Sequence, residues 1–210
     1  MTSLLITGGT IVRENDVEQA DVLIEHGKVK AVGDEVQDTG TAVQNIDASN
    51  CLVFPGFIDC HVHFREPGLT HKATMQSEGL AARSGGVTTV CEMPNTDPPT
   101  VTIAALADKV RRAHEVKECD IRFFFGITQE AHLRTLIDLW TGESQELQRL
   151  KQHCVGIKLF LEHSTGDQKI AETLLEEVFK TCGELGVHIT AHCEDAHMNA
   201  RAAAECDRRD

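Results

Sequence analysis

The strongest constraint on the fold is an alternation of short apolar segments and helical segments over residues 56–210. Five apolar segments of strand length begin roughly every 30 residues, the usual repeat of a strand followed by a helix. They are residues 57–63, 87–92, 121–127, 155–160 and 187–192. Helical patterns fill residues 72–84, 102–116, 129–139 and 170–185. Because apolar strands joined by helices form parallel sheets, the pattern predicts an α/β fold of consecutive βα units.

Residues 1–55 carry a different pattern, of short strand-like segments broken by tight turns. Apolar segments flank Gly8-Gly9 and again His26-Gly27, which predicts two hairpins. We therefore predict a small β-sandwich domain in this part of the chain.

The segment 56–210 is shorter than the roughly 250 residues of a closed (β/α)8 TIM barrel. Only five βα units can be counted in it. We expect the N-terminal part of such a barrel. We also expect that these residues alone are not a competent catalyst, because the remaining strands would have to come from elsewhere.

Composition argues against several classes of protein. The net charge of −13, with histidine neutral, argues against a general nucleic-acid surface. No apolar run reaches the ~18 residues of a membrane-spanning helix, and the first residues lack the pattern of a secretory signal. The eight cysteines form no CxxC pair. We therefore expect a reduced, cytoplasmic protein that acts on a small molecule and binds neither nucleic acid nor membrane.

His61 and His63 end the first apolar segment of the barrel. Residues i and i+2 of a strand project to the same face, so both imidazoles point toward the carboxyl ends of the strands, where βα barrels carry their sites. Neutral imidazole is a good zinc ligand. By itself a His-x-His pair also occurs as an ordinary surface or core pair, and its position after an apolar strand favours the metal interpretation.

Lys158 lies inside the apolar segment 155–160. Burial disfavours the ammonium ion, and a neutral amine can capture carbon dioxide to become a carbamate able to bridge two metals. The simpler interpretation is a lysine that extends its head group to solvent at a strand end.

His192 ends the fifth apolar segment and is a third imidazole at a carboxyl end. His188 has the same parity but lies at the other end of that segment, so we expect a core position for it. The remaining histidines lie in turns, loops or helices, where we expect solvated or structural roles.

Arg65 and Asn95 follow the first and second strands. A guanidinium and an amide suit a planar carboxylate. The alternatives are a loop salt bridge between Arg65 and Glu66, and a turn position for Asn95.

Three segments resemble known signatures. Residues 59–68, DCHVHFREPG, look like the signature of dihydroorotases. Residues 85–90, GGVTTV, followed by MPNT at 93–96, resemble the second signature of that family. Residues 53–59, VFPGFID, resemble the entry into the barrel of the wider amidohydrolase superfamily. The likeness runs from about residue 4 to the end, so the chain resembles the N-terminal portion of a dihydroorotase.

The resemblance implies a metal site. In that superfamily the ligands are His-x-His on strand one, a carbamylated lysine on strand four and histidines on strands five and six, with an aspartate on strand eight. The matching residues are His61, His63, Lys158 and His192, while strands six and eight lie outside the count. Some dihydroorotases carry aspartate at strand four, so Lys158 favours the bridging form. The resemblance further implies two zinc ions per complete site, and we expect a homodimer.

The implied reaction is the reversible cyclisation of N-carbamoyl-L-aspartate to dihydroorotate in pyrimidine biosynthesis, with Arg65 and Asn95 on the substrate carboxylate. One alternative is another cyclic amidohydrolase, a hydantoinase or allantoinase, for which Arg65 would have little use. The other is a non-catalytic dihydroorotase-like subunit, against which the presence of all four expected ligands argues.

Overall fold

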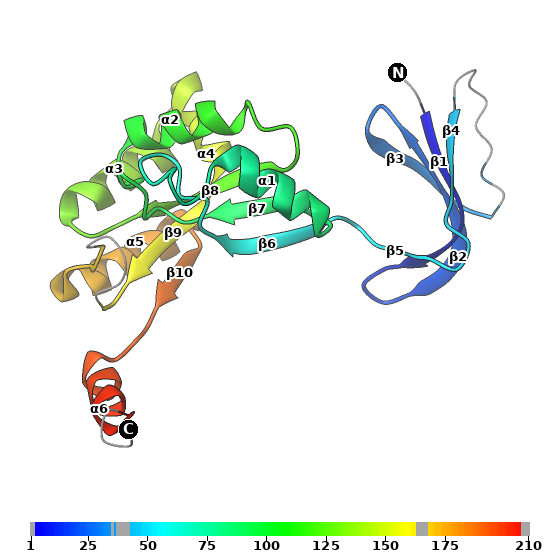
Figure 1. Ribbon diagram of the computed structural model, residues 1–210. Coiled ribbons are helices and arrows are strands. Elements are labelled where there is room, and N and C mark those ends of the chain that lie inside the picture. The colour runs from blue at the N-terminus through cyan, green and yellow to red at the C-terminus, as the bar shows by residue number, and fades with distance from the viewer. Residues whose placement is uncertain (1–2, 35, 37–42, 163–167, 207–210) are drawn as a thin grey trace. The chain divides into compact units, whose positions relative to one another are not determined.

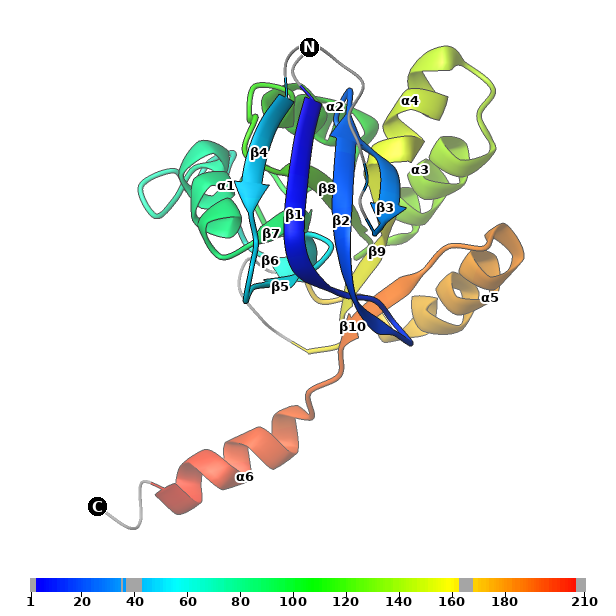
Figure 2. The ribbon, with the colours of Figure 1, turned by 90° about the vertical axis from the view of Figure 1, so that its right-hand side faces the viewer.

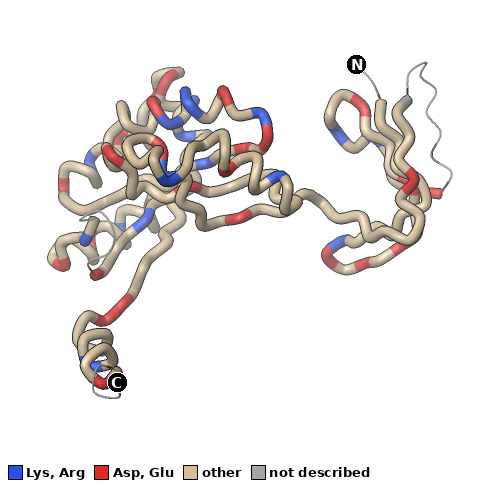
Figure 3. The backbone as a smooth tube through the Cα atoms, in the orientation of Figure 1, with Lys and Arg blue, Asp and Glu red and all other residues tan. Residues whose placement is uncertain are grey.

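The computed structural model describes residues 3–34, 36, 43–162 and 168–206, in two compact units, Met1–Phe57 and Ile58–Asp210 (Figure 1). No helix within these ranges is long and apolar enough to cross a membrane. All eight cysteines are free thiols. Figure 3 shows basic and acidic residues interspersed along the helices of the second unit. These helices therefore carry charges of both signs.

The first unit is a mixed sheet. Its strands are β1 (Ser3–Val12), β2 (Val17–Glu25), β3 (Lys28–Gly33), β4 (Val43–Asp47) and β5 (Leu52–Val53). The order is β3-β2-β1-β4, with β5 also paired to β1 (Figure 2). β2 runs antiparallel to β1 and β3, whereas β4 and β5 run parallel to β1. The described residues of this unit form a single sheet, so the second layer of the sandwich stays a prediction.

Of the two predicted hairpins, one is confirmed. His26 and Gly27 both have positive φ, 53° and 74°, as the tight turn between β2 and β3 requires. The turn expected at Gly8-Gly9 is wrong, because β1 continues through both glycines with a shift of register between Ile6 and Gly9. Gly8 there has a φ of 69° and its N–H donates to Asp21 Oδ1 at 2.9 Å. Glycine serves a bulge here, which the sequence pattern does not distinguish from a turn.

The second unit is built on the five predicted strands. They are β6 (Phe57–Val62), β7 (Val87–Glu92), β8 (Asp120–Gly126), β9 (Cys154–Phe160) and β10 (Ile189–His192). Their order, β10-β9-β8-β7-β6, follows the chain, and β7–β8, β8–β9 and β9–β10 are parallel pairs. Consecutive neighbours of this kind are the arrangement of a βα barrel, here as a half-barrel sheet.

Helices connect these strands, and a further helix, α6, follows the last of them. They are α1 (Met75–Ser84), α2 (Ile103–Ala113), α3 (Glu130–Thr141), α4 (Gln145–His153), the 3-10 turn η1 (Glu172–Leu174), α5 (Leu175–Leu185) and α6 (Ala196–Cys206). Sequence analysis missed α4, a short polar helix that buries only Leu150. Gly186 ends α5 with a φ of 68°, a left-handed cap, whereas after α1 the positive φ falls on Gly86 and not on the C-cap residue Gly85.

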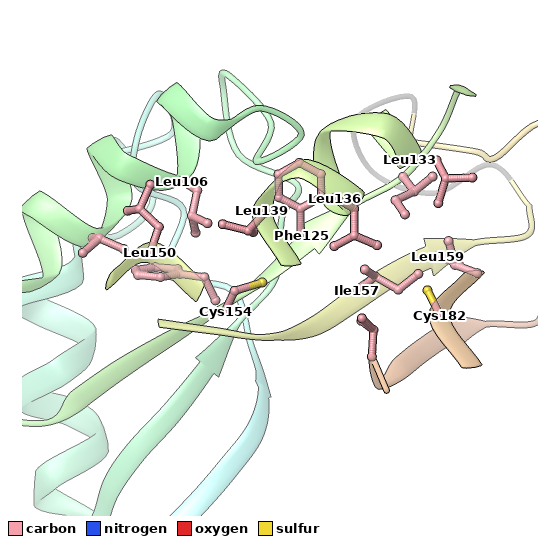
Figure 4. Packing of buried hydrophobic residues seen from close by; sticks show 14 of the residues in the cluster. Leu106, Phe125, Leu133, Leu136, Leu139, Leu150, Cys154, Ile157, Leu159 and Cys182 are labelled. Atoms are coloured by element: carbon pink, nitrogen blue, oxygen red, sulfur yellow. The ribbon is translucent and has the colours of Figure 1, made fainter. Parts of the chain in front are cut away.

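The main core lies between the sheet and its helices (Figure 4). Alternate residues of the strands, such as Phe125 on β8 and Ile157 on β9, meet Leu106 of α2 and Leu136 of α3 there. The other face of the sheet carries the smaller cluster of Cys91, Met93 and Phe124, with Val155 packed against it. The packed helices fix the positions of the strand ends, where the candidate site lies.

Candidate metal and substrate site

Three imidazoles gather at the carboxyl ends of β6 and β10. The ring centroids of His61 and His63 lie 5.4 Å apart, and those of His61 and His192 lie 5.8 Å apart. The His192 ring also contacts Phe160, at 5.6 Å between centroids, and its Nδ1 is buried with no hydrogen-bond partner in the part of the chain described. Side chains from the first and fifth strands of the sheet therefore contact each other.

Lys158 lies in the middle of β9, paired in register with Thr190 of β10. Only 1% of the residue is exposed, and its Nζ, 4.9 Å from the Phe160 ring centroid, has no hydrogen-bond partner within the described ranges. Burial lowers the pKa of this amine, because the interior disfavours the ammonium ion. The side chain therefore does not extend to solvent as the simpler interpretation supposed.

The pKa values of His61 and His63 are also lowered. Burial is the largest cause for both, and the positive charge of Lys158 contributes to each. His63 Nδ1 lies 2.8 Å from Asn95 Oδ1. Since an amide oxygen only accepts, Nδ1 carries the proton and the Nε2 lone pair is free to bind a cation.

Arg65 has a φ of 64°, a left-handed conformation that residues with a side chain seldom adopt. Its carbonyl accepts from Leu69 N at 2.9 Å, and its Nη1 is buried without a hydrogen-bond partner among the described residues. The alternative salt bridge with Glu66 does not form. Glu66 accepts instead from Met75 N at 2.9 Å and from Arg112 Nη1 at 3.0 Å.

Sequence analysis did not single out a buried ion pair behind these loops. Glu92 is the last residue of β7, Lys109 lies in α2, and each side chain is 1% exposed. Burial raises the pKa of Glu92 and lowers that of Lys109, and their mutual attraction opposes both shifts. The one available signal was a glutamate ending an otherwise uncharged strand.

No three His, Cys, Asp or Glu side chains of the described residues stand in ligand geometry around one point. The donors at the strand ends are three imidazoles and the amine of Lys158. Two of their nitrogens, Lys158 Nζ and His192 Nδ1, are buried and unpartnered within the described chain, which is costly unless a further group satisfies them. By its chemistry the set fits a zinc-type metal if Lys158 supplies the fourth ligand.

Comparisons with known proteins identify the family of the chain. The profile of the Amidohydrolase family matches residues 52–209. The dihydroorotase of Ligilactobacillus salivarius is 35% identical over 192 residues, which cover 91% of this chain and 42% of that protein. The dihydroorotase of Methanosarcina mazei is 33% identical over 198 residues, covering 94% and 41%. The chain thus spans about two fifths of these relatives.

Solved structures give the same fold. The L-hydantoinase (dihydropyrimidinase) of Arthrobacter aurescens superimposes with a TM-score of 0.80 at 26% identity, over 91% of this chain and 41% of that one. A D-hydantoinase gives 0.77 at 26% identity, over 97% and 43%. The half-barrel sheet described above therefore matches part of the TIM barrel of such enzymes.

Proposed function

Because the chain belongs to the amidohydrolase family, we propose that it acts as a dihydroorotase, which reversibly cyclises N-carbamoyl-L-aspartate to dihydroorotate in pyrimidine biosynthesis. The observation that carries this choice is one guanidinium nitrogen of the half-buried Arg65, Nη1, which is buried and has no hydrogen-bond partner among the described residues. A cationic nitrogen that is buried and unpartnered calls for an anion, and dihydroorotate differs from simpler cyclic amides by its carboxylate.

His61, His63, Lys158 and His192 would hold zinc, two ions in a complete site. Bound zinc supplies Lewis acidity toward the amide carbonyl and lowers the pKa of water. The contribution of His63 is its orientation, since the contact with Asn95 keeps its proton on Nδ1.

Lys158 would act as a carbamate. Its lowered pKa favours the neutral amine, whose lone pair forms a bond to the carbon of carbon dioxide. One π bond of carbon dioxide breaks as its electron pair moves onto oxygen, and the nitrogen loses a proton to solvent. The product is an anionic carbamate with two oxygen donors. The buried, unpartnered position of Nζ supports this role, because an unmodified amine there makes no hydrogen bond to the described residues.

Arg65 would bind the substrate carboxylate through its planar fork. Asn95 would assist from the loop after the second strand, although its oxygen already accepts from His63. Its amide N–H groups remain as the donors that it can offer to a carboxylate.

A hydantoinase is the second candidate, favoured by the superposition on hydantoinase structures. Both candidates hydrolyse a cyclic amide. They differ in the carboxylate, for which Arg65 supplies a counter-charge.

The deciding experiment is metal analysis of the complete natural protein together with ring-opening assays on dihydroorotate and on hydantoin. We expect bound zinc and turnover of dihydroorotate. Turnover of hydantoin with none of dihydroorotate would establish the second candidate instead.

A further inference from the structure

We propose that the buried ion pair of Glu92 and Lys109 positions Arg65 and Asn95, the two residues assigned above to carboxylate recognition. The inference rests on the proposed function for what Arg65 and Asn95 bind. It does not rest on that function for how their backbone segments are held.

Glu92 and Lys109 are deeply buried. Each side chain is 1% exposed, and Lys109 Nζ lies 5.5 Å from the ring centroid of Phe123, which is fully buried. Removing two charges from water is costly, and an apolar pair of similar volume often gives equal or greater stability. Stability alone is therefore a weak reason for an ion pair at this position.

The contacts of the pair reach the backbone of both substrate segments. The backbone N–H of Phe64, the residue before Arg65, stabilises the ionised Glu92 carboxylate and so opposes the rise in its pKa that burial causes. Lys109 Nζ donates to the carbonyl of Met93 at 3.1 Å, two residues before Asn95. One ion pair thus holds the first and second strand–helix loops in a fixed relation to α2.

The first loop needs such support because Arg65 adopts a left-handed φ of 64°. A second tie comes from the same helix, where Arg112 lies three residues beyond Lys109 and donates to Glu66 at 3.0 Å. Residues three apart on a helix share a face. That face of α2 therefore reaches both neighbours of Arg65 in the chain, the Glu66 side chain through Arg112 and Phe64 through the ion pair.

The direction of the Arg65 side chain depends on this backbone. Its Nη1 makes no hydrogen bond to the described residues, so no side-chain partner at that nitrogen fixes the guanidinium. If the N–H of Phe64 loses its acceptor, the loop is free to leave the strained conformation. The guanidinium of Arg65 is then no longer oriented toward the substrate carboxylate.

The test is the double variant E92M/K109M in the complete natural protein, which removes both backbone contacts and leaves no buried charge. We expect zinc content and unfolding temperature close to those of the parent protein, and an affinity for dihydroorotate about tenfold or more weaker, the size of a lost charge-assisted hydrogen bond. The matched control is E130M/R134M, which removes an exposed i,i+4 ion pair from α3. Equal affinity in the two double variants would overturn the proposal.

Adding Arg65→Ala separates positioning from general structural damage. In the control background Arg65→Ala should weaken dihydroorotate binding as much as it does in the parent protein. In E92M/K109M it should weaken binding by less than about twofold, because the effects of coupled residues are not additive. Full additivity would contradict the proposal. If Arg65→Ala has no effect in either background, the carboxylate assignment fails, and the backbone claim is then judged by hydrogen exchange.

Amide hydrogen exchange of the parent protein tests, without any variant, whether Glu92 holds the backbone N–H of Phe64. The test therefore still applies if E92M/K109M fails to fold. We expect the amide of Phe64 to exchange slowly, since its acceptor is buried. Exchange at the rate of an open loop amide would show that Glu92 does not hold it.

Discussion

At the scale of single residues, Lys158 buries an amine that has no hydrogen-bond partner among the described residues. If it is a metal ligand, Lys158→Ala should lose metal. Partners that merely orient a ligand are worth about 10–100-fold in metal affinity, so loss of a ligand should cost at least that. Metal content after dialysis against a graded chelator measures the change.

Lys180→Ala is the matched control, since Lys180 is exposed on α5 and should leave metal content unaltered. Short carboxylic acids added to Lys158→Ala should partly restore metal binding by supplying the missing oxygen donors. Metal bound equally well by Lys158→Ala and Lys180→Ala would remove Lys158 from the site.

Arg65 is the second residue with a specific expectation. Arg65→Lys keeps the charge but loses the planar fork, so dihydroorotate turnover should weaken, whereas Arg65→Ala should lose about 1.5–3 kcal/mol of substrate binding. Metal content should not change in either. Steady-state kinetics with metal analysis measure both effects, and an Arg65→Ala protein that matches the parent on dihydroorotate would contradict the carboxylate assignment.

At the scale of elements, the start of α3 depends on a neutral histidine. His132 Nδ1 lies 3.3 Å from Thr128 N, at the carboxyl end of β8, and must be unprotonated to accept that hydrogen bond. Burial lowers the pKa of His132 below the ordinary value of 6.5. The unfolded chain therefore binds the proton more readily, and the stability that this group contributes is present above pH 6.5 and lost as the pH falls below it.

His132→Asn tests this expectation, because an amide oxygen can replace Nδ1 as acceptor and does not titrate. The free energy of unfolding from denaturant titration should fall on acidification by about 0.5–1.5 kcal/mol less in the variant than in the parent, the size of one hydrogen bond. Other histidines titrate in both proteins, so only the difference is informative. Parallel pH profiles would show that His132 carries no such role.

At the scale of the whole molecule, the second unit presents β6 and β10 as the two edges of its sheet within the described residues. Ile58 on β6 is 64% exposed. An apolar strand edge is a template for pairing with another chain. A polypeptide of just these 210 residues should therefore self-associate with rising concentration, as sedimentation velocity would reveal.

Ile58→Lys should reduce that association, because a charge on an edge strand opposes pairing. Lys substituted for Leu80, which is 56% exposed on α1, is the control for added charge away from the edge and should leave association unchanged. A polypeptide that stays monomeric at the highest concentration reached would show that the edges are not open to pairing.

The sequence by itself determined the order of the elements and the chemistry available at the strand ends. Five apolar segments between helical ones became β6 to β10 in consecutive order, because burial on a sheet face selects the same residues in the sequence and in the fold. It also placed His61, Lys158 and His192 on their strands, since strand position follows from local pattern, whereas His63 lies one residue beyond the end of β6. The short polar helix α4 escaped it, because this helix has only nine residues and buries only Leu150.

Only the tertiary structure decided which side chains meet. The contact of His63 with Asn95, the burial of Lys158 and the ion pair of Glu92 with Lys109 join residues 17 or more positions apart or depend on neighbouring strands. The left-handed conformation of Arg65 is likewise held by contacts from α1 and α2 through Glu66. Local pattern reports which face a residue occupies, but the desolvation that lowers the pKa of Lys158 arises only once the strands and helices pack around it.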